Sequence, residues 1–358
     1  MAGIFGALNV NDRDRVFSAT VGQRVIYDTA MQWMMDRNAE LEAALGVFVQ
    51  ETTEEYKRRF KLPGSGYLQR RNVDGRYQAV KAQGQWDVAF PLEDMGAAIA
   101  GNDVDMRYMT IGELDLHLTT VWSQNVNTVR FEMLRAMMNN TQRPFIDPDW
   151  GTLNVEPLAN GDAVVYPPVL GSDTEAVENH YIETNYAPAS ISDTNDPLTT
   201  IKNDLEEHFD VNPAGSDIVV FSASDSVPYV KGLTGFTEVS DRFITKGDDS
   251  DELAGLPSAH PGTLIGRAKG VWYVEWRHLP STYMIGIHTG QPAPLTKRKD
   301  PADTGLNPFL ELVAKDMTFP FTDSFWRHRF GFGVGNRLNG IVLELATGGT
   351  YTIPTIYQ

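Results

Sequence analysis

The sequence contains no cysteine in its 358 residues. Disulfide bonds, thiolate metal sites, iron–sulfur clusters and a cysteine nucleophile are therefore excluded. The chain also lacks an apolar run close to the ~18 residues that a membrane-spanning helix requires, so we expect no membrane association. Met1–Val10 carries no basic residue and is followed at once by Asp12 and Arg13, so we expect no signal peptide. Stability must then come from packing within the chain or from partner subunits.

Motifs that carry catalytic or ligand-binding chemistry are also missing. The seven histidines include no His-Glu-x-x-His and no close pair at metal-ligand spacing, so each is interpreted as a core or surface residue. No Gly-x-Ser-x-Gly elbow occurs, and the adjacent carboxylates Glu206 and Glu207 point in different directions on a predicted helix. Gly331–Gly335 (GFGVG) has strand-like flanks and no following Gly-Lys-Ser/Thr, which predicts tight strand packing and not a phosphate loop. The acidic run Asp248–Glu252 lacks the EF-hand spacing and is interpreted as a solvated loop. We therefore expect no enzymatic activity, no cofactor and no bound metal.

The charge of the chain is acidic overall but unevenly placed. The formal net charge of −17 argues against direct wrapping of DNA or RNA, because such binding depends on clustered Lys and Arg. Residues 57–81 hold eight basic residues and one acidic residue, whereas residues 173–210 hold ten acidic residues and one basic residue. Two oppositely charged surfaces on one chain favour self-association.

A long amphipathic helix is predicted from Thr110 to Asn140. Thr110 and Glu113 form a capping box, and apolar residues then recur at three-and-four spacing as far as Met137. Asn139-Asn140 and Pro144 end the pattern. At 1.5 Å per residue such a helix is about 45 Å long and would act as a girder.

The other elements are expected in a fixed order along the chain. Residues 1–22 look like a flexible arm, followed by a helix over 23–46 and an extended, basic β-hairpin with strands at 67–71 and 76–80. With about 15 residues per limb this hairpin could reach about 50 Å from the body. Later expectations are a hairpin of 152–158 and 163–166 around Asn160-Gly161, a helix over 197–209 capped by Asp196, strands at 217–222, 271–276 and 283–288, a loop over 291–308, and strand-like segments at 311–321, 325–334 and 338–346.

This order of elements resembles the major capsid proteins of tailed bacteriophages, whose Hong Kong 97-type fold encapsulins share. The resemblance is carried by the order and by the stretches PFIDPDWGTLNVEPLANGDAVVYPP (144–168) and RFGFGVGNRLNGIVLELATGGTYTIP (329–354). It implies an α+β fold with an N-terminal arm (1–56), an E-loop (57–109), a peripheral domain (110–180 and 311–358) containing the spine helix 110–140, and an inserted axial α/β domain (181–310).

The resemblance also implies a function in assembly. The chain would form hexamers and pentamers of an icosahedral head in the virion, assembled in the host cytoplasm, with double-stranded DNA enclosed without sequence-specific binding. Partners would be further copies of the chain and separate scaffolding and portal proteins, and the resemblance leaves a decoration protein open. The residues expected to contact neighbouring subunits are Arg70, Arg71, Arg76, Lys81, Trp122, Glu206 and Glu207. Some members of the family cross-link an E-loop lysine to an asparagine, and Lys61 or Lys81 with Asn336 or Asn339 are candidates without a motif to anchor them.

Two other functions stay open at the level of sequence. An encapsulin-like compartment around a cargo enzyme has the same fold, so the sequence does not separate it from a phage head. A metal-dependent hydrolase using the acidic loops is disfavoured by the absent ligand spacing.

Overall fold

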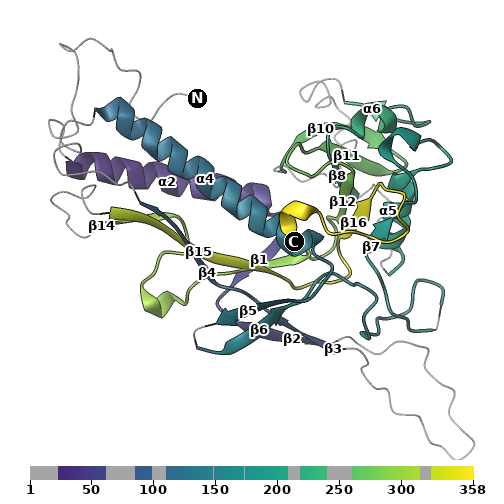
Figure 1. The fold of residues 1–358 in the computed structure, drawn as a ribbon, viewed down its shortest axis with the longest axis horizontal. Helices are drawn as coiled ribbons and strands as arrows, with labels where there is room; N and C mark the ends of the chain where they lie inside the picture. Colours follow the sequence, from purple (N-terminus) through teal and green to yellow (C-terminus); the bar gives the residue numbers. More distant parts are fainter. Residues whose placement is uncertain are drawn as a thin grey trace, which may run out of the picture. The chain divides into compact units, whose positions relative to one another are not determined.

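The computed structural model describes residues 23–61, 85–98, 110–147, 149–172, 174–208, 218–239, 260–314 and 324–358. It is a mixed α+β structure with two compact units (Figure 1). Unit 1 comes from Met1–Ala43, Pro91–Met133 and Arg298–Gly331, and unit 2 from Ala44–Phe90, Leu134–Lys297 and Phe332–Gln358. None of the helices in the described ranges carries an apolar stretch long enough to cross a bilayer.

Two long helices form one layer of unit 1. Helix α2 (Gln23–Leu45) lies beside helix α4 (Ile111–Met138) in Figure 1. Their contact faces are apolar, and Trp33 packs edge-to-face on Trp122 with ring centroids 6.1 Å apart. Both predicted helices are thus confirmed, and the 28 residues of α4 span about 42 Å.

Three antiparallel strands of a five-stranded sheet complete unit 1. Strand β15 (Ser324–Val334) lies between β4 (Glu93–Ala98) and β14 (Glu311–Ala314), and its Trp326 is fully buried in the same apolar cluster as α2 and α4. A Cβ on Gly331 would collide with the backbone of Pro91, so only glycine permits this close approach. The interpretation of the GFGVG segment as tight strand packing is confirmed.

A seven-stranded mixed sheet dominates unit 2, in the order β7-β16-β12-β8-β11-β10-β9. The strands are β7 (Tyr181–Glu183), β8 (Ile218–Ser222), β9 (Thr237–Glu238), β10 (Thr263–Ala268), β11 (Val271–Glu275), β12 (Tyr283–His288) and β16 (Ile341–Glu344). Strand β8 is buried along its whole length, as its β-branched sequence IVVFS predicts. Helix α5 (Pro197–Glu206) packs on β12 and β16, and its N-cap Asp196 accepts from the backbone N–H of Leu198 at 2.9 Å. The predicted helix with its cap and the predicted strands at β8, β11 and β12 are confirmed.

Two strands, at residues 295–298 and 341–344, differ from the sequence-based expectations. Residues 291–308 were expected to be a loop, but Leu295–Arg298 forms strand β13, which pairs with β1 (Val49–Thr53) and is buried throughout. Strand β16 lies between β7 and β12, so this C-terminal strand belongs to the same sheet as the segment we assigned to the axial domain. The domain boundaries themselves stay a prediction.

The remaining elements include two separate hairpins. Strands β2 (Lys57–Lys61) and β3 (Gln85–Ala89) form one, and β5 (Arg143–Asp147) and β6 (Gly151–Val155) form the other. Helix α6 (Val227–Val230) and 3₁₀ turns at Pro188–Ser190, Ala302–Thr304 and Thr355–Tyr357 complete the structure.

The expected hairpin around Asn160-Gly161 is wrong. Asn160 pairs with Asn179, and the amide of Gly161 donates to the carbonyl of Glu178 at 2.8 Å, so the segment turns toward residues 176–180. The true hairpin turns at Asp147, whose side chain accepts hydrogen bonds from the amides of Asp149 and Trp150. The expected arm 1–22, the strands at 67–71 and 76–80 and the acidic run 248–252 lie outside the described residues.

Candidate assembly surfaces

The base of the basic hairpin is the first candidate surface. Strands β2 and β3 pair from Lys57 opposite Ala89 to Lys61 opposite Gln85, on either side of the residues predicted to form the hairpin. Phe60 stacks on Trp86 with ring centroids 5.4 Å apart, and Trp86 in turn lies 5.9 Å from the ring of Tyr166. This aromatic chain fixes the hairpin base to the rest of unit 2. The residues 62–84 that extend it lie outside the described ranges, and with them Arg70, Arg71, Arg76 and Lys81.

Three of the four basic residues of β2 form ion pairs within the described part of the chain. Arg59 and Lys57 both bind Asp87 on the partner strand, with Arg59 Nη2 2.9 Å and Lys57 Nζ 2.8 Å from its Oδ2. The hydrogen bonds from Arg59, which has the larger effect, and from Lys57 hold the pKa of the Asp87 carboxyl far below its usual range. Arg58 binds Glu55 at 2.7 Å and also Glu51. Most of the positive charge on β2 is therefore neutralised locally.

The long helix α4 is fixed at both ends. At its start the backbone N–H of Thr110 donates to Glu113 Oε2 at 2.8 Å, and the N–H of Glu113 lies 3.4 Å from Thr110 Oγ1, which confirms the capping box. At its end the phenol of Tyr181 donates toward the carbonyls of Met137 and Asn139, and that of Tyr351 donates to Met138 at 2.6 Å. Burial raises the pKa of both phenols, so they stay protonated donors at neutral pH. These tyrosines satisfy carbonyls that a helix C-terminus leaves unpaired.

Comparison with known proteins shows which solved structures resemble this chain as a whole. No known family model matches the sequence, and no curated protein matches it either. The solved structure named "Mycobacterium phage Patience" is similar at a TM-score of 0.67 with 17% identity, covering 98% of this chain and 94% of that chain. The mature capsid of bacteriophage PhiM1 has a TM-score of 0.49 at 9% identity, covering 82% and 85%, and the virus-like particle from Pyrococcus furiosus 0.40 at 10%, covering 89% and 99%. The last two are only distantly similar to this chain.

The chain has the Hong Kong 97-type fold. The match to this solved structure runs over nearly the full length of both chains. Strands β2 and β3 lie within the range expected for the E-loop, and α4 lies within the range expected for the spine helix; both assignments stay predictions. The expected α+β class is confirmed.

Trp122 lies far in the sequence from the adjacent residues Glu206 and Glu207, and the three side chains have separate surroundings. Trp122 is half-buried on the spine helix and packs on Trp33. Glu206 is half-buried on α5, with Lys202 Nζ 3.8 Å from its carboxylate. Glu207 follows at the end of α5 and faces His208 and Glu178. Their roles in contacts between subunits stay a prediction.

The acidic residues of segment 173–210 are less exposed, and more often bound within the chain, than the sequence indicates. Of its described acidic residues only Asp193 is exposed, and the others are half-buried. Asp196 caps α5, and Asp193 binds Thr234 and Lys269. The surface that these carboxylates offer to another E-loop is therefore smaller than ten acidic residues would suggest.

Two polar residues near the C-terminus have structural roles that the sequence did not reveal. Arg337 is fully buried, and its guanidinium donates to the carbonyls of Pro157 and Leu158 and to Asp162 Oδ2 at 2.7 Å. Asn339 is also fully buried, and its amide donates to the carbonyls of His288 and Pro292 at 2.9 Å. Asn339 therefore holds a turn and is a poor candidate for a cross-link.

Proposed function

We propose that this chain is the major capsid protein of a tailed double-stranded DNA bacteriophage and that its role is structural. The observation that carries the proposal is the similarity to a mycobacterium phage protein over 98% of this chain and 94% of that one. Copies assemble into an icosahedral head as hexamers and pentamers, and the protein is located in the virion. Assembly takes place in the host cytoplasm with separate scaffolding and portal proteins.

The properties of the hairpin support the proposal that contacts between copies stabilise the shell. Within the described residues β2 and β3 form a sheet of two strands, and an isolated two-stranded hairpin is marginally stable in water. An extension that carries a strong positive charge in an acidic chain gains most by lying on a neighbouring copy. Many modest contacts of this kind, repeated by symmetry, hold a closed shell together.

The acidic charge supports enclosure of DNA without tight binding. A chain with a net charge of −17 does not neutralise phosphates over its surface as a whole. A packaged genome would then move in and out of the shell without being held by its wall.

The test is a charge reversal in the E-loop. The full chain carrying Arg70→Glu, Arg71→Glu and Arg76→Glu is expressed beside the wild type and a variant with the same three arginines changed to lysine. We expect shells in negative-stain micrographs of the wild type and the lysine variant, and folded but unassembled protein from the glutamate variant, because only the latter reverses the attraction. Far-UV circular dichroism confirms that each variant is folded.

Normal particles from the glutamate variant would contradict the role assigned to the E-loop. A stable wild-type monomer under all assembly conditions would contradict the proposal as a whole. The content of purified particles from the native source decides between the two kinds of shell, since packaged DNA marks a phage head and a cargo protein marks an encapsulin-like compartment.

A further inference from the structure

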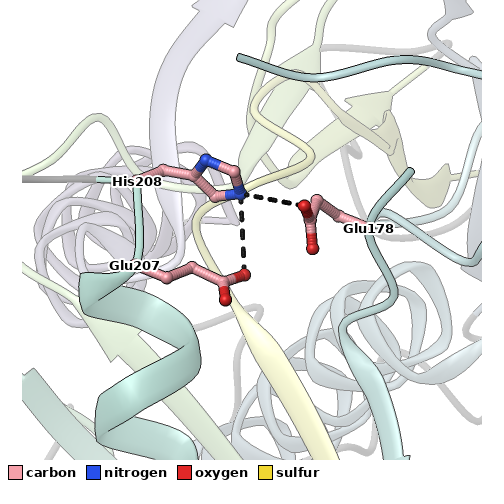
Figure 2. A group of neighbouring side chains, drawn as sticks. All are labelled: Glu178, Glu207 and His208. Atoms are coloured by element: carbon pink, nitrogen blue, oxygen red, sulfur yellow. Dashed lines mark ion pairs between the residues drawn. The ribbon is translucent and has the colours of Figure 1, made fainter. Parts of the chain in front are cut away.

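Two carboxylates and one imidazole meet in unit 2, from segments that are 29 to 30 residues apart in the sequence (Figure 2). Glu207 is the C-cap residue that follows α5, and His208 comes directly after it. Glu178 comes from the strand-like segment before β7, where its carbonyl accepts from Gly161 at 2.8 Å. The carbonyl of Glu207 accepts from the amide of Leu170 at 2.7 Å, so backbone hydrogen bonds position both sides of the cluster.

The spacing of the three side chains fits an ion better than a set of hydrogen bonds. His208 Nε2 lies 3.5 Å from Glu178 Oε1 and 3.5 Å from Glu207 Oε1, and the three ligand atoms all lie within 4.8 Å of one another. A charged N–H···O bond would draw these atoms to about 2.7–2.9 Å. Around a tetrahedral zinc ion with bonds of about 2.0–2.2 Å, the ligand atoms are about 3.3–3.6 Å apart.

The histidine is buried and aimed into the gap. The His208 side chain is only 4% exposed, and neither of its ring nitrogens makes a hydrogen bond of good geometry. Figure 2 shows one nitrogen of the ring directed at both carboxylates. Burial lowers the pKa of His208, and the carbonyls of Pro168 and Pro167 beside the ring oppose this shift. Backbone carbonyls near a metal-binding histidine commonly orient the ring and fix its tautomer.

The cluster is short of positive charge. The carboxylates of Glu178 and Glu207 are both half-buried, and their ligand atoms lie within 4.8 Å of each other. Lys202 on the same helix lies beside Glu206 instead. Half-buried carboxylates that repel one another are stabilised strongly by a cation between them.

We propose that Glu178, Glu207 and His208 bind one divalent transition-metal ion of the zinc class. Imidazole nitrogen with carboxylate oxygen is a donor set that zinc accepts, whereas magnesium and calcium prefer oxygen ligands alone and more of them. Three protein ligands leave a fourth position for water. The ion would tie the end of α5 to the segment before β7 within a single copy of the chain, so the site does not depend on assembly.

The test measures metal binding by the full chain. Protein stripped with chelator and dialysed is titrated with Co²⁺, whose visible absorption is intense in a tetrahedral site, and the bound Co²⁺ is then displaced with Zn²⁺. We expect about one ion per chain, tetrahedral bands that Zn²⁺ removes, and no displacement by an excess of Mg²⁺. Zn²⁺ should also raise the melting temperature, because it binds the folded chain preferentially.

Variants assign the ligands. His208→Gln and Glu207→Gln should each weaken Zn²⁺ binding by more than about tenfold, since loss of even a supporting residue typically costs 10–100-fold. Glu206→Gln is the matched control, because it removes the neighbouring carboxylate of the same helix and should change the affinity by less than about twofold. Far-UV circular dichroism confirms that each variant is folded.

Three results would overturn the proposal. They are a wild-type chain that retains no Zn²⁺ or Co²⁺ after dialysis, a Co²⁺ spectrum without tetrahedral bands, and equal affinities of the His208 and Glu206 variants. The first two use the wild type alone, so they decide the question even where a substitution unfolds the chain.

Discussion

Arg337 is the residue whose removal should most disturb the described core of unit 2. Its guanidinium is fully buried and supports the carbonyls of Pro157 and Leu158 together with Asp162. In Arg337→Met these acceptors lose their donors, so we expect the free energy of unfolding to fall by about 3 kcal/mol, measured from urea unfolding curves. Arg277→Met is the control, because the Arg277 side chain is 81% exposed and its loss should matter by less than about 0.5 kcal/mol. Equal effects of the two substitutions would show that Arg337 does not organise this turn.

Single polar residues were the hardest feature to predict from the sequence. Arg337 lies between two predicted strand-like segments and Asn339 within the second of them, and their partners are more than 45 residues away in the sequence. His208 was interpreted as an ordinary core or surface residue because no metal-ligand spacing surrounds it. Its partner Glu178 is 30 residues away in the sequence and reaches it only through the pairing of residues 159–166 with 176–180. Local spacing carries no signal of such tertiary contacts.

The E-loop base should loosen in acid, because its ion pairs depend on one carboxylate. Contacts with Arg59 and Lys57 lower the pKa of Asp87 in the folded chain, whereas the unfolded chain has the ordinary value near 3.9. A lowered folded pKa gives stability that is present above the unfolded pKa and is lost as the pH falls below about 4 toward the folded pKa. We expect Asp87→Asn to lower the urea midpoint at pH 7, and this difference from wild type to shrink steadily between pH 4 and pH 2.5.

The control for Asp87 is Asp149→Asn, an exposed carboxylate in the neighbouring hairpin turn, whose effect should not follow the same pH profile. A constant difference between wild type and Asp87→Asn down to pH 2.5 would mean that the ion pairs at the E-loop base do not contribute to stability.

Elements with a strong local signal were predicted well. The helices α2, α4 and α5 carry apolar periodicity or caps, and β8, β11 and β12 are runs of β-branched and aromatic residues. Strand β13 was missed because it contains Lys297 and Arg298, which look like loop residues although both are buried. The Asn160-Gly161 signal gave the wrong hairpin because a turn signal does not specify which strands it joins. Which segments pair is decided by tertiary contacts that the local pattern does not contain.

At the scale of the whole molecule, charged and apolar surfaces both favour assembly, but their contributions respond differently to added salt. The proposed contact of the basic residues 57–81 with acidic surface favours association, and exposed apolar residues such as Ile146 at 82% and Leu116 at 68% favour it as well. Ionic contacts between exposed groups are screened over about 10 Å at 0.1 M salt and over about 3 Å at 1 M, so they weaken as salt rises. Apolar contacts are strengthened by excluded salts such as sulfate.

The salt dependence of assembly therefore shows which attraction starts shell formation. We expect NaCl between 0.05 and 0.5 M to slow assembly of the wild-type chain in light scattering, because the charged E-loop steers copies together before apolar surfaces meet. Sodium sulfate at equal ionic strength should slow it less, since its exclusion from the protein surface offsets part of the screening. The variant with Arg70, Arg71 and Arg76 changed to glutamate should lose the NaCl dependence together with the rapid phase. Assembly that becomes faster with NaCl would instead place the initiating contact on the apolar surfaces, and the E-loop would then act only after copies have met.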